Sequence, residues 1–162
     1  MGFLRRLLGG QDEAKRPEAP NAAPAREDRR TEIPPDGIAL YAGAGGLLVV
    51  GSQHYRTAVK RAVGRMGPQG VTLTVALVPE PTNPYDPNAI SVQVDDQIIG
   101  YLQKATAKSY RTVMGALAQR GLTGYCRVDI KPDPNPEYDY SVHVFVDTSE
   151  RQLELIAEHD AR

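Results

Sequence analysis

The residues best suited to chemistry lie between two alternating apolar segments, in the string Glu80-Pro81-Thr82-Asn83-Pro84-Tyr85-Asp86-Pro87-Asn88-Ala89-Ile90. Its prolines restrict the backbone of a surface loop. Asn83, Tyr85 and Asp86 would then present hydrogen-bonding groups and one aromatic face in a rigid arrangement, which lowers the ordering cost of binding. A structural turn is the alternative, with Asp86 and Asn88 capping their own backbone and Tyr85 packed on the rim of the fold. Both uses are compatible in one loop.

Elsewhere in the sequence, no set of residues has the spacing of a catalytic or metal site. His54, His143 and His159 are scattered, and the single cysteine, Cys126, excludes an internal disulfide and a cysteine-built zinc site. Cys126 stands in an alternating segment, where we expect a small buried residue. The sequence contains neither a phosphate-binding P-loop nor a helicase motif. We therefore predict a protein that is not an enzyme and uses no metal or cofactor.

Charge is distributed unevenly along a chain whose formal net charge is −1. Residues 1–40 carry seven basic and seven acidic side chains, residues 41–130 carry nine and five, and residues 131–162 carry three and eight. A basic middle followed by an acidic tail suits a protein that contacts few phosphates rather than one that coats a long duplex. On charge alone, a solvated surface beside a solubilising tail fits equally well.

Length and hydropathy favour one soluble domain. A chain of 162 residues suffices for a single compact core and a terminal extension. The longest uncharged stretch, residues 37–55, is interrupted by glycines and lacks the apolar content of a membrane span. No apolar signal-peptide core follows Arg5 and Arg6. We therefore expect a cytoplasmic protein without a membrane span, which also agrees with the single cysteine.

Alternation of apolar and polar residues predicts several short strands. The segments with this pattern are 71–78, 90–94, 97–102, 126–130 and 140–146, and the apolar run 47–50 predicts a buried strand. Asp95-Asp96 separates two of the segments and predicts the tight turn of a β-hairpin. A proline-rich loop, residues 132–136, separates the last two strands.

Helical spacing of apolar residues predicts two helices that flank these strands. The first contains Val59, Val63 and Met66 and ends at Gly67-Pro68, with basic residues on its outer surface. The second runs from Ala107 to Leu117, with Thr106 as N-cap and Gly121 as the stop. Ser149 and Gln152 have the spacing of a capping box and predict a short final helix. This order predicts a mainly β fold with two flanking helices, in a small, strongly curved barrel.

The segment before these elements differs in composition. Residues 11–36 are rich in Pro, Ala and charged residues and contain one large aliphatic residue, Ile33, which predicts a flexible linker. Before the linker, four apolar residues share one face of a possible two-turn helix: Phe3, Leu4, Leu7 and Leu8. The alternatives are docking on a partner or a membrane surface, and a frayed stub.

Three segments of the chain together resemble the HIRAN domain, a module that occurs fused to DNA-dependent ATPases and also alone in bacterial proteins. They are Val49-Val50-Gly51-Ser52-Gln53-His54-Tyr55, the loop string from Glu80 to Ile90, and Ile99-Gly100-Tyr101-Leu102. The resemblance implies a small OB-like or SH3-like curved barrel. It also implies three parts: a flexible arm and linker at residues 1–46, a HIRAN-like domain at 47–147 and a short acidic helix or tail at 148–162.

The family resemblance further implies recognition of single-stranded DNA at a 3′-hydroxyl end. Asp86 would accept a hydrogen bond from the terminal hydroxyl, and Tyr85 and His54 would stack on the terminal base. Lys104 would hold a phosphate, as would the backbone around Gly51. Two further positions complete the candidate nucleic-acid site, Gln53 and Asn83.

The sequence departs from the eukaryotic HIRAN pattern at two positions. Gln53 stands where an arginine contacts phosphate, and His54 stands where a tyrosine stacks. Gln53 still donates a hydrogen bond but brings no charge, while His54 stacks and becomes cationic only near its pKa. Tyr138 or Tyr140 is a further candidate for an aromatic wall, with an ordinary position at a strand edge as the alternative.

The leading hypothesis is a non-catalytic module that binds DNA ends in repair or replication-fork processing. Since the sequence lacks an ATPase motif, a separate helicase, nuclease or ATPase chain is the implied partner. A protein-interaction adaptor that uses the same barrel is the alternative. A hydrolase or nuclease ranks below both, because the sequence shows no acid/base or metal constellation.

Overall fold

The computed structural model describes residues 32–64 and 69–161. The predicted apolar helix before the linker, nearly all of the linker, and Met66 with the predicted helix end at Gly67-Pro68 lie outside the described residues. None of the helices in the described part combines the length and the apolar composition needed to cross a membrane.

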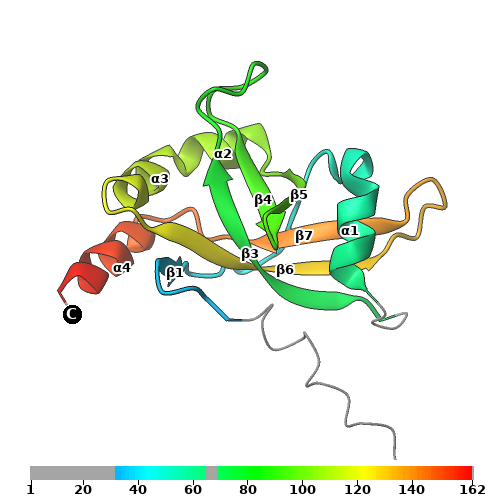
Figure 1. Cartoon of the computed structure of the whole chain (residues 1–162), viewed down its shortest axis with the longest axis horizontal. Coiled ribbons are helices and arrows are strands. Elements are labelled where there is room, and N and C mark those ends of the chain that lie inside the picture. The colour runs from blue at the N-terminus through cyan, green and yellow to red at the C-terminus, as the bar shows by residue number, and fades with distance from the viewer. Residues whose placement is uncertain (1–31, 65–68, 162) are drawn as a thin grey trace, which may run out of the picture.

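One curved sheet of seven strands, counted over the described residues, forms the body of the molecule (Figure 1). The strands are β1 (Gly37–Ala39), β2 (Leu47–Leu48), β3 (Val71–Pro79), β4 (Ile90–Val94), β5 (Gln97–Tyr101), β6 (Thr123–Pro132) and β7 (Tyr140–Phe145). Their spatial order is β2-β7-β6-β3-β4-β5, and β1 pairs with β6 in parallel orientation while the other pairings are antiparallel. The predicted mainly β fold class is confirmed.

The two edges of the sheet meet just after β2. Val50 and Tyr101 exchange two backbone hydrogen bonds of 2.9 Å, which bridge the segment after β2 to β5. Gly100 permits this approach, because a Cβ at its position, where φ is 151°, would lie 2.4 Å from the Val49 side chain. Joining opposite edges curls a sheet into a barrel, so the predicted curvature has an identifiable cause.

Alternation along the central strands places one apolar row in the core. Leu73 and Val75 of β3 lie opposite Val128 and Cys126 of β6, and all four side chains are buried. The turn between β4 and β5 is formed by Asp95 and Asp96, both with positive φ, as a tight hairpin turn requires.

The prediction of a buried strand over residues 47–50 is wrong in two respects. Regular pairing is limited to Leu47–Leu48, and only Val49 of this run is fully buried. Leu48 and Val50 are 48% and 41% exposed. Successive side chains of an extended segment point to opposite faces, so Val49 faces the core while its neighbours Leu48 and Val50 face away from it.

Helices occupy both ends of the sheet, with α1 at one end and α3 and α4 at the other (Figure 1). They are the 3₁₀ helix η2 (Ser52–Tyr55), α1 (Arg56–Val63), α2 (Lys104–Ser109), α3 (Arg111–Ala118) and α4 (Arg151–Asp160). In α1, the buried face consists of Val59, Ala62 and Val63, as predicted, but the helix already ends at Gly64 with a positive φ of 62°.

The second predicted helix is divided into α2 and α3 at Tyr110. This side chain is fully buried, and its hydroxyl donates to the Asp147 carbonyl at 2.7 Å. Thr106 lies inside α2 and is not the N-cap, a position held by Gln103 without a side-chain cap. Gly121 follows α3 with φ of 65°, in agreement with the predicted stop.

The sheet begins earlier than the expected end of the flexible arm at residue 46. Gly37–Ala39 forms β1 on β6, and Ile38 and Leu40 belong to the core. This segment has too few apolar residues for periodicity to reveal it, and its pairing partner lies more than 80 residues later in the chain.

The final helix occurs where it was predicted, but not through a capping box. Ser149 is outside α4, whose N-cap is Glu150 without a side-chain cap. Gln152 instead points into the core and is fully buried, with its amide bonded to the backbone of Tyr41. Buried hydrogen-bonding partners brought by the fold override the local capping preference.

Candidate nucleic-acid interface

The loop between β3 and β4 is held by its own polar side chains. The side-chain oxygen of Asn83, Oδ1, accepts from the backbone N–H groups of Tyr85 at 2.9 Å and Asp86 at 3.3 Å. Asp86 Oδ1 accepts from the N–H of Asn88 at 2.9 Å, and Glu80 N–H donates to Ala89 O at 2.8 Å across the base of the loop. The structural turn foreseen as an alternative is therefore present.

Tyr85 does not pack on the rim of the barrel. Its side chain is 91% exposed on a loop that projects beyond the sheet (Figure 1). An exposed aromatic ring on a rigid loop offers a face on which a ligand can stack. The capping role of Asp86 leaves the carboxylate able to accept further hydrogen bonds, since each carboxylate offers several acceptor sites.

The second group of predicted site residues occupies the turn that forms η2. Gly51 adopts a left-handed conformation with φ of 75°, and its carbonyl accepts from His54 N–H at 2.9 Å. Gln53 and His54 are both exposed. The turn therefore presents two adjacent polar side chains to solvent, on a backbone that glycine adopts at little cost.

A chain of hydrogen bonds joins this turn to the β3–β4 loop. Asn83 Nδ2 donates to Glu80 Oε2 at 2.9 Å, and the Tyr101 hydroxyl donates to the same carboxylate at 3.2 Å. The Tyr55 hydroxyl, at the end of η2, donates to that of Tyr101 at 3.5 Å. The bond with Tyr55, followed by burial and the nearby Glu80 carboxylate, raises the pKa of Tyr101. Two segments separated by 25 residues are thus tied together.

Lys104 stands at the start of α2, next to both segments. Immediately before it, Leu102 N–H donates to Ile90 O at 3.0 Å and the Gln103 side chain donates to Leu48 O at 3.3 Å. Lys104 is exposed and, within the described part of the chain, belongs to no ion pair. A solvated ammonium group in this position is free to contact a phosphate.

Two cations near Lys104 were not singled out from the sequence. Lys108, one turn later in α2, and Arg111, at the start of α3, are exposed and likewise form no ion pair with the described residues. The helical spacing of Lys104 and Lys108 was a signal available in the sequence. It has meaning only once α2 is known to begin beside the loop.

A hollow of about 340 Å³ adjoins the η2 turn, whose residues Gly51, Ser52 and Gln53 line it. Its walls come from two parts of the chain, the segment before α1 and the β6–β7 loop with the start of β7: Leu48, Val49, Val50, Gly51, Ser52, Gln53, Asp133, Tyr138, Tyr140 and Ser141. Tyr138 is 44% exposed and precedes β7, whereas Tyr140 is its first residue. Of the two candidate aromatic walls, Tyr138 has the side chain that is more exposed to solvent.

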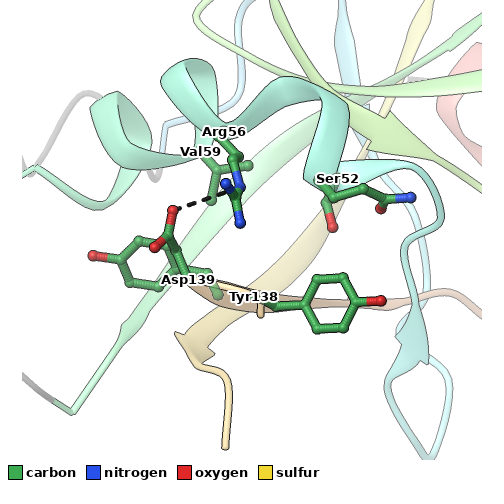
Figure 2. Close-up of a pocket in the computed structure, with 7 residues that line it drawn as sticks. Ser52, Arg56, Val59, Tyr138 and Asp139 are labelled. Carbon is green, nitrogen blue, oxygen red and sulfur yellow. Dashed lines mark ion pairs between the residues drawn. The ribbon is translucent and has the colours of Figure 1, made fainter. Parts of the chain in front are cut away.

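The loop that carries Tyr138 is attached to α1 by charged contacts. Arg56 donates to Glu137 O at 2.7 Å and lies 3.7 Å from Asp139, while Lys60 lies 3.0 Å from Asp139. Figure 2 shows Arg56 directed at Asp139 in the small hollow that adjoins the larger one. Both ion pairs are exposed, so they position the loop more than they stabilise the fold.

The described residues contain no cluster of three or more His, Cys, Asp or Glu side chains that would hold a metal ion. Cys126 is buried, and burial raises the pKa of its thiol to about 12. It is therefore a small core residue, as predicted, and not an activated nucleophile.

Comparison with known proteins found a family match and one similar structure. The profile of the HIRAN domain matches residues 43–126. The crystal structure of the HIRAN domain of human HLTF is 21% identical in sequence, with a TM-score of 0.35, and the alignment covers 70% of this chain and 84% of that one. No curated protein matches the chain.

Proposed function

Because the chain belongs to the HIRAN domain family, which is known for DNA binding, we propose that it binds single-stranded DNA at a free 3′-hydroxyl end. HIRAN domains are generally non-catalytic by themselves. The proposed setting is DNA repair or replication-fork processing in the cytoplasm, beside a helicase, nuclease or ATPase supplied by another chain. The observation that carries the proposal is the hydrogen-bonded chain from Asn83 through Glu80 and Tyr101 to Tyr55.

This series of hydrogen bonds matters because it connects the β3–β4 loop to the η2 turn, and these two segments contain most of the predicted site residues. The loop contributes Tyr85 as a stacking face and Asp86 as the acceptor for the terminal hydroxyl. The η2 turn contributes His54 as a second stacking group and Gln53 as a neutral donor to phosphate. Preorganised groups on two connected segments bind a flexible strand at a lower entropic cost than independent loops.

The remaining contacts would follow the strand away from its end. Lys104 contacts a phosphate, and Tyr138 offers a third stacking face beside the Gly51–Gln53 turn. Both contacts are insensitive to base identity, since every base has an aromatic face and every nucleotide a phosphate. We therefore expect end recognition with weak sequence preference.

Asp86→Asn tests the proposal most directly. The wild-type protein should prefer a single strand with a 3′-hydroxyl over one with a 3′-phosphate, because the phosphate would force two negative charges together. Asparagine preserves the size and one acceptor but loses the charge, so binding of the hydroxyl end should weaken by about 1–2 kcal/mol. Binding of the phosphate end should weaken less or improve. Fluorescence anisotropy with matched oligonucleotides measures both.

Two outcomes would contradict end recognition. If wild-type protein binds both ends equally, the 3′-hydroxyl has no special contact. If Asp86→Asn weakens both ends equally, Asp86 acts only through its bond to Asn88 N–H. Circular dichroism on the same samples establishes that the variant is folded.

A groove beside the same loop favours a second candidate function, the binding of a peptide. It has a volume of about 480 Å³ and is lined mainly by apolar residues of the loop and of α2 and α3: Pro79, Pro81, Pro87, Asn88, Ala89, Ile90, Ala107, Arg111, Met114, Gly115 and Ala118. Because Arg111 lines it without an ion-pair partner among the described residues, the expected occupant is an apolar segment flanked by a carboxylate.

Gly115→Leu separates the two functions. A Cβ at Gly115 meets no atom within 4 Å, so the larger side chain should fill the groove without disturbing the core. If the groove binds a peptide, the Gly115→Leu variant should bind a fluorescent peptide of leucines and glutamates more weakly than wild type does. It should still bind DNA ends. If wild-type protein does not bind such a peptide, the second function is excluded.

A further inference from the structure

We infer that Glu80 is a positioning residue for the DNA-end site. Its carboxylate fixes the position of the Tyr85–Asp86 segment relative to the η2 turn. The inference rests on the function proposed above. It assigns a role to a half-buried acidic residue at the base of the loop that would otherwise oppose DNA binding.

One arm of the arrangement runs from Glu80 into the loop. Asn83 is bound twice by Glu80, through Nδ2 to Oε2 at 2.9 Å and through its backbone N–H to the Glu80 carbonyl at 3.0 Å. The other end of the Asn83 amide accepts from the N–H groups of Tyr85 and Asp86. The orientation of the Asn83 side chain is therefore set by Glu80, and the positions of Tyr85 and Asp86 follow from it.

The second arm runs from Glu80 to the η2 turn. The Tyr101 hydroxyl lies 3.3 and 3.2 Å from the two carboxylate oxygens and accepts from Tyr55, whose ring centroid is 6.0 Å from that of Tyr101. The Tyr101 hydroxyl is a neutral donor at physiological pH, as a tyrosine ordinarily is, and the upward shift of its pKa moves its ionisation further from that range. Tyr101 is also bridged through its backbone to Val50, directly before the turn.

The negative charge of Glu80 allows its positioning role to be distinguished experimentally from its electrostatic repulsion of DNA. The partners of its carboxylate in the described part of the chain are neutral donors, Asn83 and Tyr101, so its negative charge is not neutralised locally. A negative charge near phosphate repels DNA, so removal of the charge alone should strengthen binding. Removal of the hydrogen bonds should weaken it. The two effects have opposite signs.

Three substitutions and one control exploit this difference. Glu80→Ala removes charge and hydrogen bonds, while Glu80→Gln removes the charge but keeps an acceptor for Asn83 and a group that can bond to the Tyr101 hydroxyl. Tyr101→Phe removes the second arm alone, both the bond from the hydroxyl to Glu80 and the bond from Tyr55, and leaves the bonds between Glu80 and Asn83 in place. Glu150→Ala, an exposed carboxylate next to α4, is the matched control for loss of one negative charge.

The readout is the ratio of affinities for single strands with a 3′-hydroxyl and a 3′-phosphate. Glu80→Ala should weaken binding of the hydroxyl end by about five- to tenfold and reduce the ratio, as expected for lost hydrogen bonds. Tyr101→Phe should reduce the ratio by about two- to threefold. Glu80→Gln should keep the ratio and bind both ends at least as tightly as wild type, and Glu150→Ala should change neither affinity by more than about twofold.

The outcomes distinguish this inference from the proposed function. If wild-type protein shows no preference for the hydroxyl end, the proposed function fails and the inference with it. If wild-type protein shows the preference and Glu80→Ala retains it, or weakens both ends equally, Glu80 is not a positioning residue although the function stands. If Glu80→Ala does not fold, Tyr101→Phe decides. A folded Tyr101→Phe variant whose ratio of affinities for the two ends equals that of wild type would overturn the inference, although the proposed function would stand.

Discussion

Two hydrogen-bonded networks of similar chemistry lie in different parts of this molecule. In the first, the fully buried Gln152 amide binds the backbone N–H and carbonyl of Tyr41, the Asp147 carbonyl and the Tyr110 hydroxyl, all within 3.2 Å. In the second, the half-buried Glu80 carboxylate binds Asn83 and Tyr101. Each network joins segments that are distant in the sequence.

The difference in burial assigns different tasks to the two networks. Water does not reach the fully buried Gln152 side chain, so loss of its amide leaves the Tyr41 N–H without compensation. Water can reach the partners of Glu80, so its bonds contribute little stability but still define where the loop points. The buried network should therefore determine whether the protein folds, and the open network how well it binds.

The largest expected effect is that of Gln152→Ala. Loss of the amide leaves the N–H of Tyr41 unpaired beside a new cavity, although the Tyr41 carbonyl still accepts from Asp147 N–H at 3.2 Å. The free energy of unfolding should fall by about 4 kcal/mol. Gln119→Ala, an exposed glutamine at the end of α3, is the matched control and should change it by less than about 0.5 kcal/mol. Urea denaturation measures both. Similar losses in the two variants would remove the contrast between buried and open networks.

Truncation of the N-terminus should have the next largest effect, and it depends on where the cut is made. Deletion of residues 1–31 should leave the stability unchanged. Deletion of residues 1–40 removes β1 with the buried Ile38 and Leu40 and should reduce the free energy of unfolding by about 3 kcal/mol. Thermal unfolding of the two truncated chains tests this. Equal melting temperatures would show that β1 does not contribute to the stability of the sheet.

On the open side of the molecule, Tyr85 and Lys104 should affect binding in different ways. Tyr85→Ala should cost about 2 kcal/mol of DNA affinity through lost stacking, with little change in salt dependence. Lys104→Ala should weaken binding to all sequences and reduce the slope of log affinity against log salt by about one unit. Neither variant should melt at a lower temperature. Identical salt slopes would refute the separate roles.

The smallest effect concerns the pH dependence of stability. Burial raises the pKa of Cys126 to about 12, above the value of 9.0 for a free thiol, so the unfolded chain loses its proton at a lower pH than the folded chain. The stabilising contribution is complete below pH 9 and decreases as the pH rises. Between pH 8 and 10, wild-type protein should lose about 1 kcal/mol more stability than Cys126→Ala. Urea midpoints at the two pH values measure the difference, and parallel losses would contradict it.

The sequence predicted the central strands because their pattern is local. Val71, Leu73 and Val75 alternate with threonines, and the Asp95-Asp96 pair occupies the tight turn that was expected. Local pattern failed where a position is set by distant partners. Gln152 had the spacing of a capping box but reaches Tyr41, and β1 was invisible because its stability comes from pairing with β6.

The candidate site was predicted residue by residue, but not its construction. Asn83, Tyr85, Asp86, Gln53 and His54 could be named from the family signature. That signature contains Glu80 and Tyr101 as well, yet nothing in their spacing indicates that a carboxylate at one strand end meets a hydroxyl at another. The sequence does not choose between Tyr138 and Tyr140 as an aromatic wall, and in the structure both line the hollow beside the Gly51–Gln53 turn, with Tyr138 the more exposed.

The sequence by itself determined the mainly β class, the hairpin and the rigid loop, because alternation, turn residues and prolines act over a few neighbouring residues. Only the tertiary structure decided how the sheet closes, since Gly100 must admit Val49 before Val50 can pair with Tyr101. That closure is also what places Tyr101 between Glu80 and Tyr55. The site is therefore a consequence of barrel curvature, a property of the whole sheet that no local pattern encodes.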